Sequence, residues 1–103
     1  MELKECYTKV DNVFFEYAMS LKPNEIKVLL YIIRNTVGYH KDEFETNYSK
    51  ISEACLMARR HAKISIEGLV KIGLITKYDS YKYDFFIVYD TKNVKNIMLD
   101  FCV

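Results

Sequence analysis

Apolar residues recur along most of this chain at the spacing of an amphipathic helix, and in one stretch at the spacing of a strand. The clearest helical stretch begins at Pro23, which costs no hydrogen bond at a first helical position. We expect this helix to run to about Val37 and to end at Gly38, because glycine readily takes the left-handed conformation of a C-cap. Its buried stripe is predicted to comprise Ile26, Leu29, Leu30, Ile33 and Val37.

A helix-turn-helix pair is predicted over residues 47–72, after a short strand around Phe44. Asn47 is a suitable N-cap for the first helix of the pair. The apolar side of that helix is expected to comprise Tyr48, Ile51 and Cys55. The second helix is expected from about Ala58 to Ile72, with Gly73 closing it. Its inward face is expected to hold Ala62, Ile66, Leu69 and Val70, and its outward face Arg59, Arg60, Lys63, Glu67 and Lys71.

After Gly73 the apolar period changes from that of a helix to that of a strand. Leu74–Tyr78 and Tyr81–Tyr89 are predicted to pair as a β-hairpin over about residues 74–89, with its turn at Asp79–Ser80. A short terminal helix is expected over about residues 92–101. The prediction is therefore an α+β fold in one domain, residues 1–103. Its helical core, two-stranded wing and terminal helix are the components of a winged helix-turn-helix.

Length and composition fit one small globular domain, with 103 residues of which 50% are hydrophobic and 28% charged. The longest apolar run, Val28–Ile33, is far shorter than the roughly 20 residues that a membrane span requires. The first residues lack the apolar core of an export signal. We therefore expect a soluble cytoplasmic protein with no membrane partner.

Positive charge is concentrated in one part of the chain, although the formal net charge is only +1. Residues 50–77 contain six cations against Glu53 and Glu67, a local charge of +4. These cations are Lys50, Arg59, Arg60, Lys63, Lys71 and Lys77. A chain with this distribution can turn one side toward a polyanion.

The sequence gives no support for catalysis or for a cofactor. Cys6, Cys55 and Cys102 are far apart, and neither histidine has a cysteine at the spacing of a metal site, so reduced thiols are expected. Phosphate-loop, dinucleotide-binding, metalloprotease and nucleophile-elbow motifs are all missing from the sequence. We therefore expect a non-enzymatic protein without a metal ion.

Two blocks of residues resemble the N-terminal domain of bacteriophage replication protein O, over roughly residues 7–77. The first block reads Tyr7-Thr8-Lys9-Val10-x-Asn12 and then Glu25-x-Lys27-Val28-Leu29-Leu30-x-Ile32-x-Arg34-x-Thr36-x-Gly38-Tyr39. The second reads Ser49-x-Ile51-x-Glu53-Ala54, Arg59-Arg60 and Ile66-x-x-Leu69-x-x-x-Gly73-Leu74-Ile75. The resemblance implies a winged helix that binds repeats in a phage replication origin. Family members normally carry a further C-terminal segment that recruits the helicase, which we expect to be absent here.

The sequence departs from the family pattern at the turn between the paired helices. The family has a glycine and then a capping Ser or Thr, where this chain has Leu56 and Ala58. Loss of the capping oxygen costs about 1 kcal/mol of helix stability. Ile64 also stands at an outward position where the family usually has a basic or polar residue.

The leading hypothesis is a phage-type winged helix that binds double-stranded DNA in replication initiation or its regulation. Arg59 or Arg60 would pair with a guanine edge in the major groove, and Lys63 would meet a phosphate. The alternative for this group is an ordinary solvated helix face. For the hairpin, the alternative is a set of tyrosines that stabilise one another across the strands. The residues expected to bind DNA are Lys50, Arg59, Arg60, His61, Lys63, Lys77, Tyr78, Tyr81 and Lys82.

The second hypothesis is a winged helix that binds a protein, such as a host replication or defence protein. The exposed Ile64 would contribute to that surface. The terminal helix has an apolar face that needs a cover, which a second copy of the chain would provide in a homodimer. The expected contact residues on that helix are Ile97, Met98 and Phe101.

Overall fold

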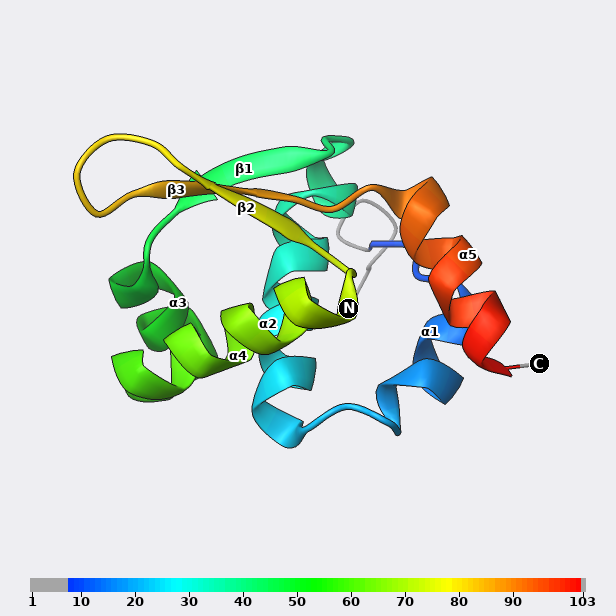
Figure 1. Ribbon diagram of the computed structural model, residues 1–103. Helices are drawn as coiled ribbons and strands as arrows, with labels where there is room; N and C mark the ends of the chain where they lie inside the picture. Colours follow the sequence, from blue (N-terminus) through cyan, green and yellow to red (C-terminus); the bar gives the residue numbers. More distant parts are fainter. Residues whose placement is uncertain (1–7, 103) are drawn as a thin grey trace, which may run out of the picture.

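The elements of residues 8–102 follow the predicted order of a helical core, a sheet and a terminal helix, so the fold is α+β (Figure 1). A computed structural model describes these residues, with side chains described for residues 8–100. The helices are α1 (Asn12–Ala18), α2 (Pro23–Asn35), α3 (Tyr48–Cys55), α4 (Arg59–Ile72) and α5 (Thr91–Cys102), with a 3₁₀ turn at Val37–Tyr39. The strands are β1 (Glu43–Thr46), β2 (Thr76–Asp79) and β3 (Phe85–Val88).

Helix α2 is the centre of the core and packs against both α3 and α4. Its buried apolar residues are Val28, Leu29, Ile32 and Ile33, so Leu29 and Ile33 of the predicted stripe are confirmed. Leu30 is 47% exposed and its predicted place in the stripe is wrong, because the buried face is centred on Leu29 and Ile32; Ile26 and Val37 are partly buried. The sheet lies along one side of the helices, whereas α1 and α5 lie side by side at the end of the molecule opposite the hairpin loop (Figure 1). The loop between β2 and β3 and the pair α3–α4 therefore share the other end.

The end of α2 differs from the prediction. The helix stops at Asn35, where the buried Thr36 donates its hydroxyl to the Ile32 carbonyl (2.7 Å). The left-handed residue that follows is His40, with φ 57°, and not Gly38. A Cβ at position 38 would lie 2.9 Å from Nη1 of Arg34, so that the end of this flexible side chain would have to move.

Helix α4 has the predicted bounds and ends at Gly73, which has φ 95° and is a left-handed C-cap. Ala62, Ile66 and Leu69 are buried as predicted, but Val70 is exposed, so its expected place on the inward face is wrong. Ser65 is buried in addition and donates its hydroxyl to the His61 carbonyl (2.8 Å). Because that bond satisfies the hydroxyl within the helix, a polar residue is tolerated on this face.

The sheet has three antiparallel strands in the order β1-β3-β2, so the predicted short strand joins the hairpin. Its central strand β3 places Phe85 and Ile87 on the buried face, opposite Thr46 and Phe44 of β1. The other face carries Phe86, next to the acidic residues of β1 and to Tyr78 of β2. The alternation along β3 therefore separates a core face from a solvent-facing one.

The hairpin turn is longer than predicted. Asp79 belongs to β2, and the chain turns over Ser80–Asp84, where the Ser80 amide donates to the Asp84 carbonyl (3.0 Å). The predicted turn at Asp79–Ser80 and the predicted second strand from Tyr81 are therefore wrong. Lys82 takes the left-handed conformation, with φ 57°. A non-glycine residue seldom adopts this conformation, so the sequence gives no sign of it.

The terminal helix α5 covers about the predicted range, but its apolar face is not free. Val94 and Met98 are each 2% exposed, and α5 packs against α1. The expectation that Met98 needs a cover from a second chain is therefore wrong, since α1 of the same chain supplies it. Ile97 is partly buried against the core, and the side chain of Phe101 lies outside the described residues.

The buried hydroxyl of Tyr89 makes stability depend on pH at the alkaline end. Burial and the nearby Asp11 carboxylate raise the pKa of Tyr89 from 10.0 to about 12. The unfolded chain ionises first as the pH rises above about 10, so the free energy of unfolding should fall by roughly 2–3 kcal/mol as the pH rises from 10 to beyond 12. We expect Tyr89→Phe to flatten this fall in urea unfolding, whereas Tyr39→Phe, at an exposed tyrosine, should not. If the free energy of unfolding of Tyr89→Phe fell with pH as steeply as that of the wild type, ionisation of Tyr89 would not be the cause.

Candidate nucleic-acid interface

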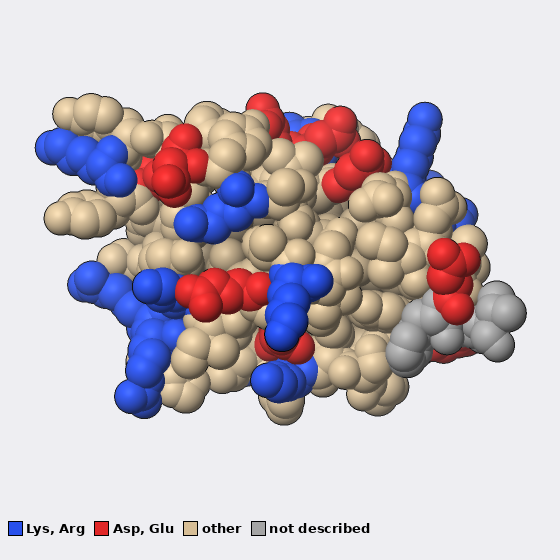
Figure 2. Space-filling view, viewed as in Figure 1, with Lys and Arg blue, Asp and Glu red and all other residues tan. Residues whose placement is uncertain are grey.

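A groove of about 500 Å³ separates the hairpin loop from α3 and the first turns of α4. Its lining includes four cations, Arg59, Arg60, Lys63 and Lys82, against the single carboxylate of Asp84. Figure 2 shows lysine and arginine side chains on both sides of the notch between the hairpin and the helices. Converging cations in a concave surface raise the local concentration of an anionic ligand.

The start of α4 adds to this positive potential. Ala58 occupies the N-cap position and makes no side-chain capping bond, and the first turn contains no acidic residue. Arg59 and Arg60 stand there instead, at the positive end of the helix dipole, where cations are unfavourable by roughly 0.3–1 kcal/mol each. An anion bound at this end would be attracted both by the helix dipole and by the two guanidinium groups.

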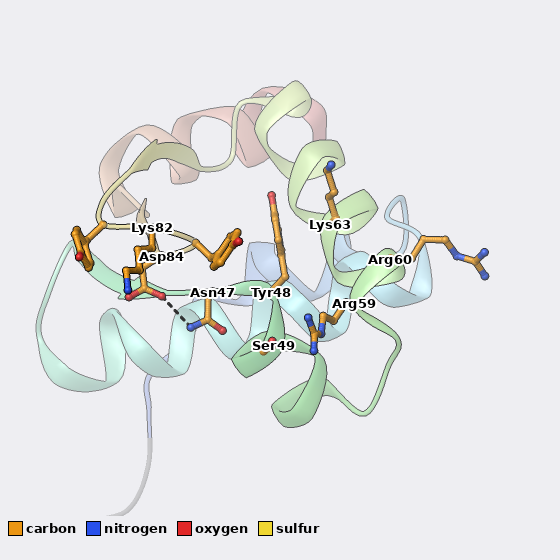
Figure 3. A pocket seen from close by; sticks show the side chains of 10 residues that line it. Asn47, Tyr48, Ser49, Arg59, Arg60, Lys63, Lys82 and Asp84 are labelled. Carbon is orange, nitrogen blue, oxygen red and sulfur yellow. Dashed lines mark hydrogen bonds between the residues drawn. The ribbon is translucent and has the colours of Figure 1, made fainter.

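Asn47 connects the two walls of the groove. Its Oδ1 accepts from the Lys50 amide (2.9 Å) and caps α3, as predicted. Its Nδ2 donates to Oδ1 of Asp84 (3.0 Å) in the hairpin loop. One side chain therefore fixes the start of α3 and the position of the loop, and it also engages the carboxylate of the groove (Figure 3).

We expect Asn47→Ala to destabilise the fold by about 1–2 kcal/mol, because it removes both the cap and the bond to Asp84. Asn47→Ser keeps a capping oxygen and loses only the loop contact, so it should cost less. Urea unfolding of the two variants measures the difference. Equal losses in both would show that the capping bond to the Lys50 amide contributes nothing to stability, and no loss in Asn47→Ser would show the same of the contact with Asp84.

Tyrosines line the groove together with the cations. Tyr48 rises from α3 between the hairpin loop and Lys63 of α4 (Figure 3), and its ring packs at 4.8 Å from that of Phe85. Tyr81 is 71% exposed and Tyr83 is 89% exposed on the loop. Aromatic faces next to cations are the components of a surface that binds nucleic acid.

The family model for bacteriophage replication protein O matches residues 1–91 of the 103. The chain belongs to this family. The membership confirms the resemblance in the sequence and gives the protein a role in phage DNA replication. A search of curated proteins returned no match.

Five of the nine residues that we expected to bind DNA line the groove of this family member: Arg59, Arg60, Lys63, Tyr81 and Lys82. They come from two segments that are separate in the sequence and are brought together by the fold, the first turns of α4 and the β2–β3 loop. The Arg60 guanidinium points away from the other groove side chains (Figure 3). The fold therefore brings together the larger part of the predicted set.

Two of the other expected residues, His61 and Lys77, are engaged by contacts within the chain. His61 lies beside the start of α2, where its Nδ1 is 3.2 Å from Nδ2 of Asn24. Lys77 extends over the ring of Phe85 (4.9 Å) and pairs with Asp79 (3.7 Å). Both side chains therefore stabilise packing and are absent from the lining of the groove.

Tyr78 and Lys50 also lie outside the lining of the groove. Tyr78 is on the outer face of the sheet, where its hydroxyl donates to Glu43 and its ring stacks on Phe86. The bond to Glu43 holds the proton and raises the pKa of Tyr78. Lys50 is exposed in the first turn of α3.

Sequence reasoning missed part of the lining of the groove, namely Asn47, Tyr48, Ser49, Tyr83 and Asp84. Asn47 and Tyr48 already had structural roles as a cap and a packing residue, and Tyr83 was expected within a strand. The usable signal was the Tyr-Lys-Tyr segment between Ser80 and Asp84, since both flanking residue types favour turns.

The departures from the family pattern have visible consequences. Leu56 takes the left-handed conformation with φ 55° at the position of the family's glycine, and its side chain is exposed. Ile64 is 56% exposed and borders a cavity of about 200 Å³ with Pro23, Asn24 and His61. Neither Ile64 nor the three residues beside it line the cationic groove. Helix α4 therefore contributes to two distinct surfaces.

The described residues contain neither a membrane-spanning helix nor a cluster suited to a metal ion. No helix within residues 8–102 has both the length and the apolar character that crossing a bilayer requires. The same residues contain no cluster of three or more His, Cys, Asp or Glu side chains suited to a metal ion. Cys55 is a buried free thiol, and burial raises its pKa.

Proposed function

We propose that this replication protein O family member is a winged-helix DNA-binding protein acting in the initiation of phage replication or its regulation. In this proposal α3 and α4 are the helix-turn-helix, α4 is the recognition helix, and the β2–β3 hairpin is the wing. The observation that carries the proposal is the convergence of Arg59, Lys63 and Lys82 on one groove. The place of action would be the cytoplasm of the host, where phage DNA replicates.

The geometry suits a duplex that spans both walls of the groove. The major groove is about 12 Å wide and admits one helix, so α4 can enter it with its N-terminal residues toward the bases. Arg59 would contact a base edge or a phosphate there, and Lys63 a phosphate. The wing would place Lys82 on the adjacent backbone. These contacts need no cofactor and no catalysis.

Salt dependence of duplex binding tests the proposal. With the four groove cations each neutralising a phosphate, affinity for a random-sequence duplex should fall about a hundredfold between roughly 50 and 200 mM salt. Fluorescence anisotropy of a labelled duplex measures this change. Absence of binding by the folded protein at the lower salt would overturn the proposal.

A second candidate function is binding of a host or phage replication protein through the surface around Ile64. The observation that favours it is the exposed isoleucine beside the small cavity at the start of α2, away from the cationic groove. Ile64→Glu should then weaken binding to a candidate partner and leave duplex binding within about threefold. Arg59→Glu should have the opposite pattern. Loss of duplex binding in Ile64→Glu would assign this surface to DNA.

A further inference from the structure

We propose that the groove also takes an unpaired nucleotide of single-stranded DNA, with the base stacked on the loop tyrosines and the phosphate on Arg59 and Lys63. This inference rests on the proposed function in one respect only, that the same groove meets DNA. Single-stranded DNA would then be a second ligand of the groove, and it becomes available at an origin when the two strands separate.

The groove is large enough to hold a nucleotide. Its volume of about 500 Å³ lies within the range of about 300–1,000 Å³ of pockets that enclose a small organic molecule. A nucleotide belongs to that size class. A duplex can lie across the mouth of such a groove, but it cannot place a paired base inside.

The two tyrosines of the β2–β3 loop are largely exposed. Tyr83 is 89% exposed and makes no side-chain hydrogen bond or ring contact within residues 8–100. Tyr81 is 71% exposed, and Nζ of Lys82 lies 5.3 Å from the centroid of its ring. Most of the surface of these two side chains is therefore open to a ligand. Two exposed aromatic rings on one loop indicate a contact surface.

The side chains that line the groove suit an unpaired base better than a paired one. Base faces are inaccessible in a stacked duplex, which presents only base edges and phosphates to a protein. Tyrosine rings are poor readers of those edges, but they stack on any base that has left the helix. The cations nearby supply the phosphate contacts, and Asn47 engages the carboxylate of Asp84. This combination is the pattern of proteins that bind single strands with little sequence preference.

The test compares two probes on one pair of variants. The probes are a fluorescein-labelled oligothymidine of about 12 nucleotides and a random-sequence duplex. Tyr81→Leu/Tyr83→Leu keeps the apolar bulk and removes the stacking faces, and Tyr39→Leu is the control at an exposed tyrosine outside the groove. Circular dichroism verifies that each variant is folded.

We expect the wild type to bind oligothymidine, and the double variant to lose about tenfold or more on that probe but less than about threefold on the duplex. Equal losses on both probes would overturn the inference, because the tyrosines would then be duplex contacts. Duplex binding without oligothymidine binding would overturn it and leave the proposed function intact. Failure to bind either probe would overturn both.

A second measurement needs no variant. An oligothymidine with one 2-aminopurine base should lose fluorescence on binding if that base stacks on tyrosine in the groove. Anisotropy of the same complex verifies that the probe is bound. Unquenched 2-aminopurine in a bound complex, at every position of the substituted base, would contradict base stacking.

Discussion

Arg59→Glu/Lys63→Glu is expected to weaken duplex binding by more than about a hundredfold at roughly 50 mM salt. The groove has four cations and one carboxylate, so reversing two of its charges leaves two cations against three carboxylates. The variant should also lose about half of the salt dependence of binding, because two fewer phosphates are neutralised and the slope of log K against log salt becomes shallower by about 2. Fluorescence anisotropy across a salt series measures both quantities.

The matched control is Lys92→Glu/Lys95→Glu on α5, which changes the net charge of the chain by the same amount. Both lysines are absent from the groove, and the ion pair of Lys95 with Asp11 (3.9 Å) is exposed. Such a pair contributes at most about 1 kcal/mol to stability. The control should bind the duplex within about threefold of wild type. Equal losses in the two double variants would show that overall charge, and not the groove, governs binding.

Ile66→Ala is expected to lower the free energy of unfolding by about 2–5 kcal/mol, a large part of the 5–15 kcal/mol typical of a domain. The Ile66 side chain is fully buried on the inward face of α4, and α4 packs against α2. Truncation removes apolar contacts and leaves a cavity that the neighbouring helices fill only in part. Urea denaturation followed by circular dichroism measures the loss.

Ile64→Ala on the same helix is the matched control, because it makes the same chemical change at an exposed position. It should alter the free energy of unfolding by no more than about 0.5 kcal/mol. A comparable loss in both variants would contradict the orientation of α4 and, with it, the placement of Arg59 and Lys63 on the groove.

The helical part of the fold could be predicted because its signals are local. The buried positions of Leu29 and Ile33 on α2, the cap at Asn47 and the left-handed Gly73 each depend on residues within a few positions of one another. Local propensity and burial favour the same structure at these points, so the spacing of apolar residues is sufficient to predict the helices. The resemblance to replication protein O added the family, which the match to residues 1–91 confirms.

The groove could be predicted only in part, because it depends on contacts between distant segments. The bond from Asn47 to Asp84 joins positions that are 37 residues apart. The loop that carries Tyr83 turns at Lys82, whose left-handed backbone is unusual for a lysine. Met98 shows the same limit, since its spacing indicates a face that must be covered but does not indicate that α1 covers it.

Titration of the isotope-labelled protein with a random-sequence duplex, followed through its backbone amide NMR spectrum, tests the central claim most directly. We predict that the largest shift changes fall in residues 47–49, at the start of α4 around Arg59, and in the loop Ser80–Asp84. Changes concentrated on α1 and α5 or on the outer face of the sheet, with the groove unaffected, would contradict binding of DNA in the groove.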